Sequence, residues 1–387
     1  MRRTILLLLA ALSLQAREVA RVPAEIRGNR VVVDVEVNDL PPSKFILDTG
    51  AASTVVEKSY AAARGLRSTG QMQAQGAAGS VNVGVAENLV FEVGGDVRVP
   101  AARVALIPME PILLRAGSPV DGVLGREVFN AYVVEIDYER SAVAFHERKS
   151  FTSTGVRVPL QFVHGSIPQV DVRLTLPDGR TVPARLHLDT GAGPGLILTR
   201  SFVKRHHIEM PDGIDTALGL GVGGATTERT GRIGKLEFAG FTFDKPVAML
   251  SNSMKGLLGN AEVDGILGGE ILRRFTLQID YGRKELYLTR NANFGEPIEI
   301  DMLGATLAAS DTSFRSIVVQ SLIPKTAAVE AGLREGDELR AIDGRAVTPR
   351  ELDSVRRMFR KPDQRYELTI ARGGKELIIR VKTRRVV

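Results

Sequence analysis

Hydrophobic and polar residues alternate in short runs along most of the chain, and these runs predict β-strands. Residues 31–37 read Val-Val-Val-Asp-Val-Glu-Val, and after Pro41-Pro42 a second run over residues 44–47 reads Lys-Phe-Ile-Leu. A period of two, with turn-forming residues between the runs, indicates a β-hairpin. The second run leads directly into Asp-Thr-Gly at residues 48–50.

The same order of elements returns in the second half of the chain. Strand-like runs over residues 170–176 and 181–188 lead into a second Asp-Thr-Gly at residues 189–191. Three pairs of landmarks keep nearly the same spacing, which is 141 residues for Asp48 with Asp189, 143 for Asp121 with Asp264, and 143 for Asp137 with Asp280. A spacing kept across a whole half indicates a duplicated unit.

Short helices and glycine-rich segments separate these strands. Residues 53–65 predict a strand followed by a short helix that is broken at Gly65, and further helices are expected over residues 126–131 and 199–207. Residues 70–100 predict a hairpin with a glycine-bearing tip at Gly76 and Gly79, and residues 219–224 occupy the corresponding place in the second half. Two interpretations of the first hairpin stay open: it closes over a bound substrate, or it is a pair of ordinary surface strands.

The pattern changes near residue 301. Residues 331–333 read Ala-Gly-Leu, residues 336–339 read Gly-Asp-Glu-Leu, and residues 342–344 read Ile-Asp-Gly. A helix over residues 349–359 and strands over 366–371 and 377–381 follow. This stretch predicts a third, smaller domain.

Composition favours a mostly β protein of two or three domains. The chain has 387 residues, with 39 Gly, 18 Pro and neither Cys nor Trp, and glycine-rich turns between Val/Ile/Leu runs are typical of β folds. Without cysteine, disulfides, thiolate nucleophiles and cysteine-type zinc sites are excluded. The net charge of +6 comes from basic residues interspersed with acids, so no nucleic-acid partner is expected.

The first residues predict an export signal. Met1-Arg2-Arg3 precedes an almost wholly apolar stretch over residues 4–14, which is typical of a secretory signal peptide over residues 1–16. We therefore expect an exported protein, periplasmic or secreted. The alternative is a retained N-terminal membrane anchor.

The repeated acids suggest a specific chemistry. Peptide hydrolysis without a metal or an activated Ser or Cys is possible when two carboxyl groups share one water and hold one proton between them. Asp48 and Asp189 are the candidate pair. The hydroxyls of Thr49 and Thr190 are placed to cross-link the two loops, and Gly50 and Gly191 allow the backbone to turn tightly beside each acid.

These motifs resemble those of the aspartic proteases. Residues 25–290 carry two Asp-Thr-Gly motifs, each with a downstream pair of apolar residues and a glycine, at 123–125 and 266–268. Ala51 and Ala192 make the lobes more similar to the retropepsin-like type. The resemblance implies a duplicated pepsin/retropepsin-like β-fold with lobes over residues 25–150 and 155–292. It also implies a catalytic pair Asp48–Asp189 within a monomer, a flap that includes Gly76 and Gly79, and no metal or cofactor.

The chain departs from the retropepsin pattern at several positions. The acid that often follows the motif in retroviral enzymes is Ala52 in the first copy and Gly193 in the second, so the contacts between the lobes must differ. Where the first copy has Ile46, the second has His187. This histidine either lines the cleft and adds a titratable group or is packed in its strand.

The C-terminal part resembles a bacterial PDZ domain, a small α+β fold, over residues 298–385. The resemblance implies that Leu303, Gly304, Ala305, Thr306 and Leu307 form a loop whose backbone N–H groups capture a peptide C-terminus. The peptide would then add as a strand to the edge of the sheet.

Other candidate residues have simpler interpretations. Asp121 and Asp264 precede glycine and are expected to form turns, and Asp137 and Asp280 are expected to be structural. Residues 219–224 lack the Lys-Ser/Thr ending of a phosphate loop. His206-His207 has no companion ligands, so no metal site is expected.

The leading hypothesis is therefore an exported aspartic endopeptidase, acting on peptide or protein substrates that its PDZ domain recruits or positions. The alternative is a non-catalytic two-lobed peptide-binding protein with a PDZ domain. In a third arrangement, lobes from two chains pair to form the dyad.

Overall fold

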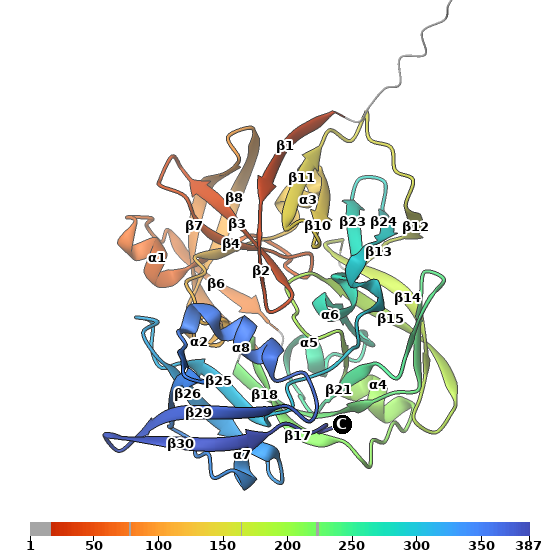
Figure 1. Cartoon of the computed structure of the whole chain (residues 1–387). Coiled ribbons are helices and arrows are strands. Elements are labelled where there is room, and N and C mark those ends of the chain that lie inside the picture. The colour runs from red at the N-terminus through yellow and green to blue at the C-terminus, as the bar shows by residue number, and fades with distance from the viewer. Residues whose placement is uncertain (1–16, 77–78, 164, 222–223) are drawn as a thin grey trace, which may run out of the picture.

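The protein is mostly β and forms two similar lobes and a smaller C-terminal domain (Figure 1). The computed structural model describes residues 17–76, 79–163, 165–221 and 224–387. The predicted signal peptide over residues 1–16 lies outside the described residues. We call residues 25–150 the first lobe, 155–292 the second lobe and 298–385 the C-terminal domain. Among the described residues, no helix is long and apolar enough to cross a membrane.

The first-lobe sheet begins with the predicted hairpin. Val31, Val33, Val35 and Val37 are buried while Asp34 is exposed, so the alternation in the sequence separates the core face from solvent. In spatial order the strands are β2 (Glu25–Arg27), β3 (Arg30–Val37), β4 (Ser43–Leu47), β9 (Gly122–Leu124), β5 (Val55–Glu57), β8 (Val97–Ile107), β7 (Ser80–Val93) and β6 (Gly70–Gln75).

The second-lobe sheet repeats this arrangement. The parallel pair β4–β9 of the first lobe corresponds to the parallel pair β15–β22 of the second. In spatial order the strands are β17 (Ile214–Gly221), β18 (Gly224–Arg232), β21 (Val247–Ser251), β16 (Leu196–Leu198), β22 (Gly265–Gly268), β15 (Thr181–Asp189), β14 (Ile167–Thr175), β19 (Lys235–Phe238) and β20 (Phe241–Asp244), with β13 (Gln161–Val163) beside β14. The repeat seen in the sequence is thus a repeat of structure.

A third sheet joins the two lobes. Its strands are β1 (Glu18–Pro23), β11 (Ala142–His146), β10 (Val133–Asp137), β23 (Phe275–Asp280), β24 (Glu285–Arg290) and β12 (Val156–Pro159). The antiparallel pair β10–β23 crosses from one lobe to the other. One continuous cluster of buried apolar side chains includes Phe45 and Phe129 of the first lobe and Phe202 and Phe275 of the second. The lobes therefore share a core.

Short helices cover the lobes. They are α1 (Lys58–Ala63), α2 (Glu110–Ala116), α3 (Arg126–Ala131), α4 (Arg200–Arg205), α5 (Gly256–Gly259), α6 (Gly269–Leu272) and the 3-10 helix η1 (Ala292–Gly295). The strand and helix expected within residues 53–65 correspond to β5 and α1, and the helices expected over 126–131 and 199–207 correspond to α3 and α4, so those predictions are confirmed.

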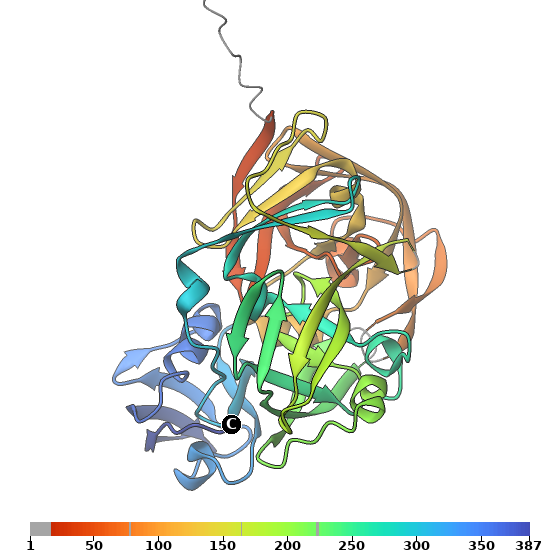
Figure 2. The ribbon, with the colours of Figure 1, turned by 90° about the vertical axis from the view of Figure 1, so that its right-hand side faces the viewer.

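The C-terminal domain has its own core, around Leu303, Ile317, Leu339, Phe359 and Ile370. Its sheet has the order β25 (Ala305–Ala309), β26 (Ile317–Leu322), β27 (Glu338–Ile342), β29 (Arg365–Arg372) and β30 (Lys375–Lys382), with β28 (Arg345–Ala346) beside β27. The helices α7 (Ala327–Glu330), η2 (Pro349–Glu351) and α8 (Leu352–Met358) complete it. Figure 2 shows this domain beside the second lobe, at the end of the molecule away from the N-terminal strand.

Glu270 on α6 lies where all three parts of the protein meet. It is 6% exposed. Its carboxylate accepts hydrogen bonds from Asn29 of the first lobe at 3.0 Å and from Arg360 of the C-terminal domain at 2.9 Å. Within the second lobe it pairs with the fully buried Arg274 at 3.0 Å. Burial opposes its ionisation, but Arg360 and Arg273 outweigh burial, so the pKa of Glu270 lies below its ordinary value.

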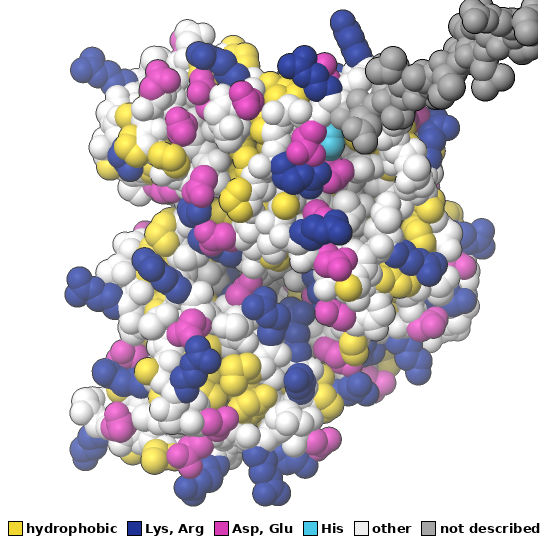
Figure 3. Space-filling view, turned by 45° about the horizontal axis from the view of Figure 1, so that its top comes forward, with side chains coloured by type: hydrophobic (Ala, Val, Ile, Leu, Met, Phe, Trp, Pro, Cys, Tyr) yellow, Lys and Arg dark blue, Asp and Glu magenta, His cyan; other side chains and the backbone are white. Residues whose placement is uncertain are grey.

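Charges of both signs are mixed on the surface. Figure 3 shows Lys and Arg side chains interspersed with Asp and Glu over the face that it displays. That face carries no broad basic stripe of the kind that binds nucleic acid.

We expect Glu270→Gln to lower the free energy of unfolding at pH 7 by about 3–5 kcal/mol, because it leaves buried cations without their counter-charge. A carboxyl whose pKa is depressed by folding stabilises the protein above its unfolded pKa and loses that effect as the pH falls through the folded pKa. The difference between wild type and variant should therefore shrink below the unfolded value of 4.5. Urea unfolding followed by circular dichroism measures it.

Glu237→Gln is the matched control, because Glu237 forms only an exposed pair with Arg173. It should change the stability by less than about 0.5 kcal/mol. Equal effects of the two substitutions would contradict the structural role of Glu270.

Candidate active site

Asp48 and Asp189 end equivalent strands and lie against each other's loops. Asp48 follows β4 and Asp189 ends β15. A Cβ atom on Gly50 would lie 2.7 Å from the Asp189 carboxyl carbon, and one on Gly191 would collide with the Asp48 carboxyl group. Glycine is therefore needed at both positions for the two loops to approach this closely. The structure thus brings together the two acids that the repeat singled out.

Four hydrogen bonds cross-link the two loops through their threonines. The Thr49 hydroxyl donates to the Leu188 carbonyl at 2.6 Å and accepts from the Thr190 N–H at 3.0 Å. The Thr190 hydroxyl donates to the Leu47 carbonyl at 2.8 Å and accepts from the Thr49 N–H at 3.1 Å. Both threonines are fully buried. The cross-link expected from the sequence is present.

The two carboxyl groups differ in their surroundings. The Gly50 N–H donates to Asp48 at 2.7 Å, and the Ala192 N–H donates to Asp189 at 2.8 Å. Burial and then the charge of Asp189 raise the pKa of Asp48 well above its ordinary value. Burial also raises the pKa of Asp189, but the Ala192 N–H and a hydrogen bond from Asp48 oppose the rise. The pKa of each acid is thus raised, and the two acids titrate as a pair.

Two tyrosines face the pair, and sequence reasoning missed both. The Tyr281 hydroxyl donates to the Thr49 carbonyl at 3.3 Å. Burial and then the charges of Asp48 and Asp189 raise its pKa. Burial and then the charge of Asp189 also raise the pKa of Tyr138, so both phenols stay neutral. The signal was available: these tyrosines follow the repeated Asp137 and Asp280 and share their spacing.

Arg30 is a third residue that the sequence patterns did not mark. Its side chain lies beside the second-lobe loop, and its Nε–H donates to the Gly191 carbonyl at 2.6 Å. Its charge acts on both Asp189 and Asp48. The first-lobe hairpin places it there, and its partner is 161 residues away in the sequence, so no local pattern marks it.

The glycine-bearing hairpin β6–β7 reaches across to the second lobe. The Gly76 N–H donates to the Gly79 carbonyl at 2.8 Å, and the Gly76 carbonyl accepts from the Leu257 N–H of α5 at 3.1 Å. The corresponding hairpin β17–β18 contacts α2 of the first lobe through β17. Each lobe thus extends a hairpin to the other. Residues 77–78 and 222–223 lie outside the described residues.

The other sequence-marked acids take structural positions. Asp121 accepts from the Lys44 N–H at 2.9 Å and Asp264 from the Arg185 N–H at 2.9 Å, so each stabilises the strand that leads to one of the candidate acids, Asp48 or Asp189. His187 is 3% exposed and lies in β15 between Gln169 and Ile266 of the neighbouring strands. This burial favours the packed interpretation. Among the described residues, no group of three or more His, Cys, Asp or Glu side chains is placed to hold a metal ion.

The expected carboxylate-binding loop is corrected in part. Leu303 and Gly304 precede a strand, but Ala305, Thr306 and Leu307 belong to β25 and pair with β26. Leu303 and Leu307 point into the domain core because an apolar strand here completes that core. The Leu303 N–H already donates to the Asp301 carboxyl at 2.8 Å. Burial raises the pKa of Asp301 to about 6.

β25 is the edge strand of its sheet, and its outer edge faces the first lobe. β25 contacts α2, which lies beside α8 in Figure 1. The Arg356 guanidinium of α8 donates to the Leu307 carbonyl of β25 at 2.6 Å and to the Arg115 carbonyl of α2 at 2.8 Å. Phe314, from the turn between β25 and β26, packs on the first-lobe cluster that includes Leu113 and Val83. A peptide adding to this edge would have to displace α2.

Comparison with known proteins identifies two families. A family model described as Aspartyl protease matches residues 33–128 and 170–271, just over half of the chain. A model described as PDZ domain matches residues 300–383.

Two individual proteins are also similar. The curated "Probable CtpA-like serine protease" of Staphylococcus haemolyticus (strain JCSC1435) is 27% identical over 179 residues, which are 44% of this chain and 33% of that protein. This chain thus spans about a third of that relative's length. The crystal structure of aspartic proteinase from Irpex lacteus matches with a TM-score of 0.44 and 13% identity, over 72% of this chain and 99% of that one.

We expect Thr49→Val to destabilise the protein by about 2–6 kcal/mol, because the buried Leu188 carbonyl and Thr190 N–H each lose their partner at about 1–3 kcal/mol apiece. Urea unfolding measures the change. Thr181→Val, at an exposed position whose hydroxyl meets only Thr175, is the control and should be nearly neutral. A Thr49→Val variant as stable as this control would show that the cross-link does not hold the loops together.

Proposed function

Because the chain belongs to the aspartyl protease family, we propose that it is an aspartic endopeptidase in which Asp48 and Asp189 activate one water. The observation that carries the proposal is the meeting of the two acids at one site. Thr49 and Thr190 hold their loops together, and each acid lies against the glycine of the opposite motif. Only a reaction that uses both carboxyl groups needs them this close, since bringing two acids together raises their pKa values.

In the proposed mechanism the two acids take opposite roles, and we assign the proton of the resting pair to Asp48. Asp189, ionised, accepts a proton from the water as the water oxygen bonds to the peptide carbonyl carbon, and Asp48 donates its proton to the carbonyl oxygen. In the second half, Asp189 gives its proton to the amide nitrogen while Asp48 takes one from a hydroxyl of the tetrahedral diol. The C–N bond breaks and the pair returns to its starting state. Tyr138 and Tyr281 stay neutral and add no charge to the site.

The two hairpins supply the cover for this site. Gly76 and Gly79 lie at the tip of β6–β7, which is hydrogen-bonded to α5 of the opposite lobe, and β17–β18 meets α2 in the corresponding way. We assign the flap role to β6–β7 and extend it to β17–β18. Closure by both would exclude bulk water from the carboxyl groups and hold an extended peptide between them.

Two other readings remain distinct from this proposal. The Staphylococcus haemolyticus relative is named as a serine protease, which suggests a serine-type peptidase. A protein that only binds peptides would keep the fold without hydrolysis. The position of the acid pair favours the aspartic type over both.

The cellular setting forms part of the proposal. The basic and then apolar residues 1–16 support export, to the periplasm or beyond the cell, with a retained N-terminal anchor as the alternative. The sheet β10–β23 and the core shared within one chain support a monomer. The PDZ domain supports binding of peptides or proteins, and we propose that its β25 edge takes peptide C-termini once α2 has moved.

We expect Asp48→Asn and Asp189→Asn each to reduce peptide hydrolysis by at least about 10³-fold, since the two acids act as a unit. The measurement is cleavage of a peptide library, with and without a pepstatin-type transition-state mimic and a serine-directed reagent. Inhibition by the mimic, lost in Asp48→Asn, supports the proposal. Asp121→Asn, at a strand-bracing position, is the control. Hydrolysis that survives both substitutions, or that only the serine reagent blocks, would overturn the assignment.

For the PDZ domain, we expect a labelled peptide with a free C-terminus to bind more tightly than the same peptide amidated. Arg356→Ala should strengthen this binding, because it removes the tie between α2 and β25. Arg350→Ala, at an exposed neighbouring position, should leave it unchanged. Fluorescence anisotropy measures the affinities, and equal binding of the free and amidated peptides would refute C-terminal recognition.

A further inference from the structure

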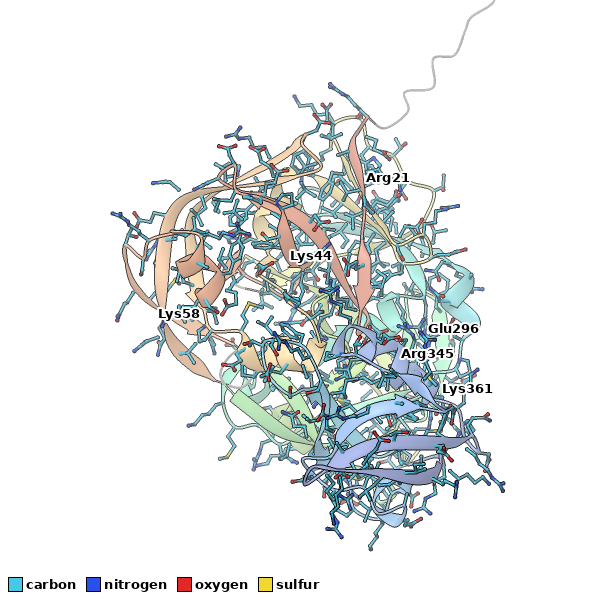
Figure 4. All side chains as sticks on the ribbon, turned by 60° about the vertical axis from the view of Figure 1, so that its left-hand side comes forward. Arg21, Lys44, Lys58, Glu296, Arg345 and Lys361 are labelled. Atoms are coloured by element: carbon cyan, nitrogen blue, oxygen red, sulfur yellow. The ribbon has the colours of Figure 1, made fainter. Side chains whose placement is uncertain are left out.

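The first turn of α8 places an acid of the PDZ domain against the protease lobes. Asp353 accepts a hydrogen bond from the Gly28 N–H in the turn between β2 and β3. A Cβ atom on Gly28 would lie 3.6 Å from the Asp353 carboxylate and 3.2 Å from the Arg30 guanidinium. Asp353 and Arg30 thus flank the same short stretch of backbone, residues 28–30. In Figure 4, Arg345 and Lys361 mark the PDZ domain and Lys44 marks the first lobe, and side chains crowd the boundary between them.

The turn at residues 28–30 also holds the loop that carries Asp189. Asn29 donates its side-chain N–H to the Gly193 carbonyl at 3.0 Å, and Arg30 donates to the Gly191 carbonyl at 2.6 Å. A Cβ atom on Gly193 would lie 2.6 Å from the Gly28 carbonyl oxygen, so the two backbones are in direct contact.

These contacts lead from Asp353, through residues 28–30, to the carboxyl groups of Asp48 and Asp189. Gly191, whose carbonyl Arg30 holds, lies against the Asp48 carboxyl group. The charge of Arg30 interacts most with Asp189, then with Asp353, and then with Asp48. A shift of the 28–30 turn would therefore move the Asp189 loop and change the charge that the pair experiences.

We infer that the PDZ domain supplies a positioning residue, Asp353, which holds residues 28–30 and, through Arg30, fixes the loop that carries Asp189 in its reactive geometry. This inference rests on the proposed function, in which Asp48 and Asp189 are the reacting groups. Asp353 acts through Arg30 and Gly28 and does not touch the substrate. The PDZ domain is then part of the support of the active site as well as a binding module.

Arg30 lies among several charged groups, so the pH dependence of hydrolysis distinguishes a positioning role of Asp353 from a purely structural contact. Arg30 faces Asp48, Asp189 and Asp353, with Arg115 and Arg356 as cationic neighbours. Asp353 itself pairs with Arg357 at 3.8 Å, and Tyr138 and Tyr281 are the titratable phenols beside the pair. Without the charge of Asp353, Arg30 would act more strongly on the pair and favour its ionised form. Without Arg30, the pair would ionise less readily.

The test uses the full chain and measures hydrolysis against pH for wild type, Asp353→Asn and Arg30→Met. Asp353→Asn should lower kcat by up to about 100-fold, the cost of misplacing reacting groups by about 1 Å. KM should stay within about twofold of wild type, because substrate contacts are unchanged. The acidic limb should move to lower pH in Asp353→Asn and to higher pH in Arg30→Met. Asp353→Glu, which keeps the charge, should restore part of kcat.

Amide hydrogen exchange of residues 189–193 supplies a readout that needs no activity. Exchange should be faster in Asp353→Asn than in wild type. The matched control is Asp363→Asn, also on the PDZ domain, where the acid pairs only with the exposed Lys382; it should match wild type throughout. Should Asp353→Asn fold poorly, Arg30→Lys keeps the charge and loses the Nε–H donor. It should show fast exchange with an unshifted acidic limb.

The outcomes are separable. A wild-type protein that hydrolyses nothing refutes the proposed function, and exchange at residues 189–193 still decides whether Asp353 holds the loop. An active wild type with Asp353→Asn indistinguishable from Asp363→Asn in kcat, acidic limb and exchange refutes the inference alone.

Discussion

The candidate active site depends on the reciprocal hydrogen bonds between Thr49 and Thr190. Each hydroxyl satisfies a carbonyl and an N–H of the opposite loop in a fully buried position. Burial and the repulsion between Asp48 and Asp189 both disfavour ionisation of the two carboxyl groups. The hydrogen bonds of the threonines hold the two loops together against this repulsion. The threonine hydrogen bonds therefore offset the energetic cost of bringing the two buried acids together. The shared core and the β10–β23 pair keep the lobes in register around it.

The contacts of the PDZ domain converge on the same place. Glu270 joins α6 to Asn29 and Arg360, and Asp353 joins α8 to the Gly28 backbone. Both reach the turn at residues 28–30, which holds the Asp189 loop through Asn29 and Arg30. A further contact, through Arg356, connects α2 with β25. Displacement of α2 by a peptide at β25 would thus disturb a helix whose Leu113 packs in the same first-lobe cluster as Val83 of the β6–β7 hairpin.

Much of this arrangement is readable in the sequence because the chain repeats itself. The paired motifs at Asp48 and Asp189, the threonine cross-link and the helix over residues 126–131 follow from local patterns and from a constant spacing. Arg30, Asp353 and Glu270 do not, because each acts on partners far away in the chain. The prediction of a loop over residues 303–307 is wrong in part, because residues 305–307 form a strand and the apolar Leu303 and Leu307 complete the domain core. The PDZ contacts with the lobes likewise arise from packing between domains, which no local pattern encodes.

The proposed function requires Asp48 and Asp189 to act as one unit that shares a proton. The most direct measurement is carbon-13 NMR titration of carboxyl-labelled aspartates in wild type and Asp48→Asn. We expect two well-separated ionisation steps for the pair, with the upper one well above the ordinary value of 3.8 and absent in Asp48→Asn. Two carboxyl groups that ionise together near 3.8, unaffected by each other's substitution, would contradict it.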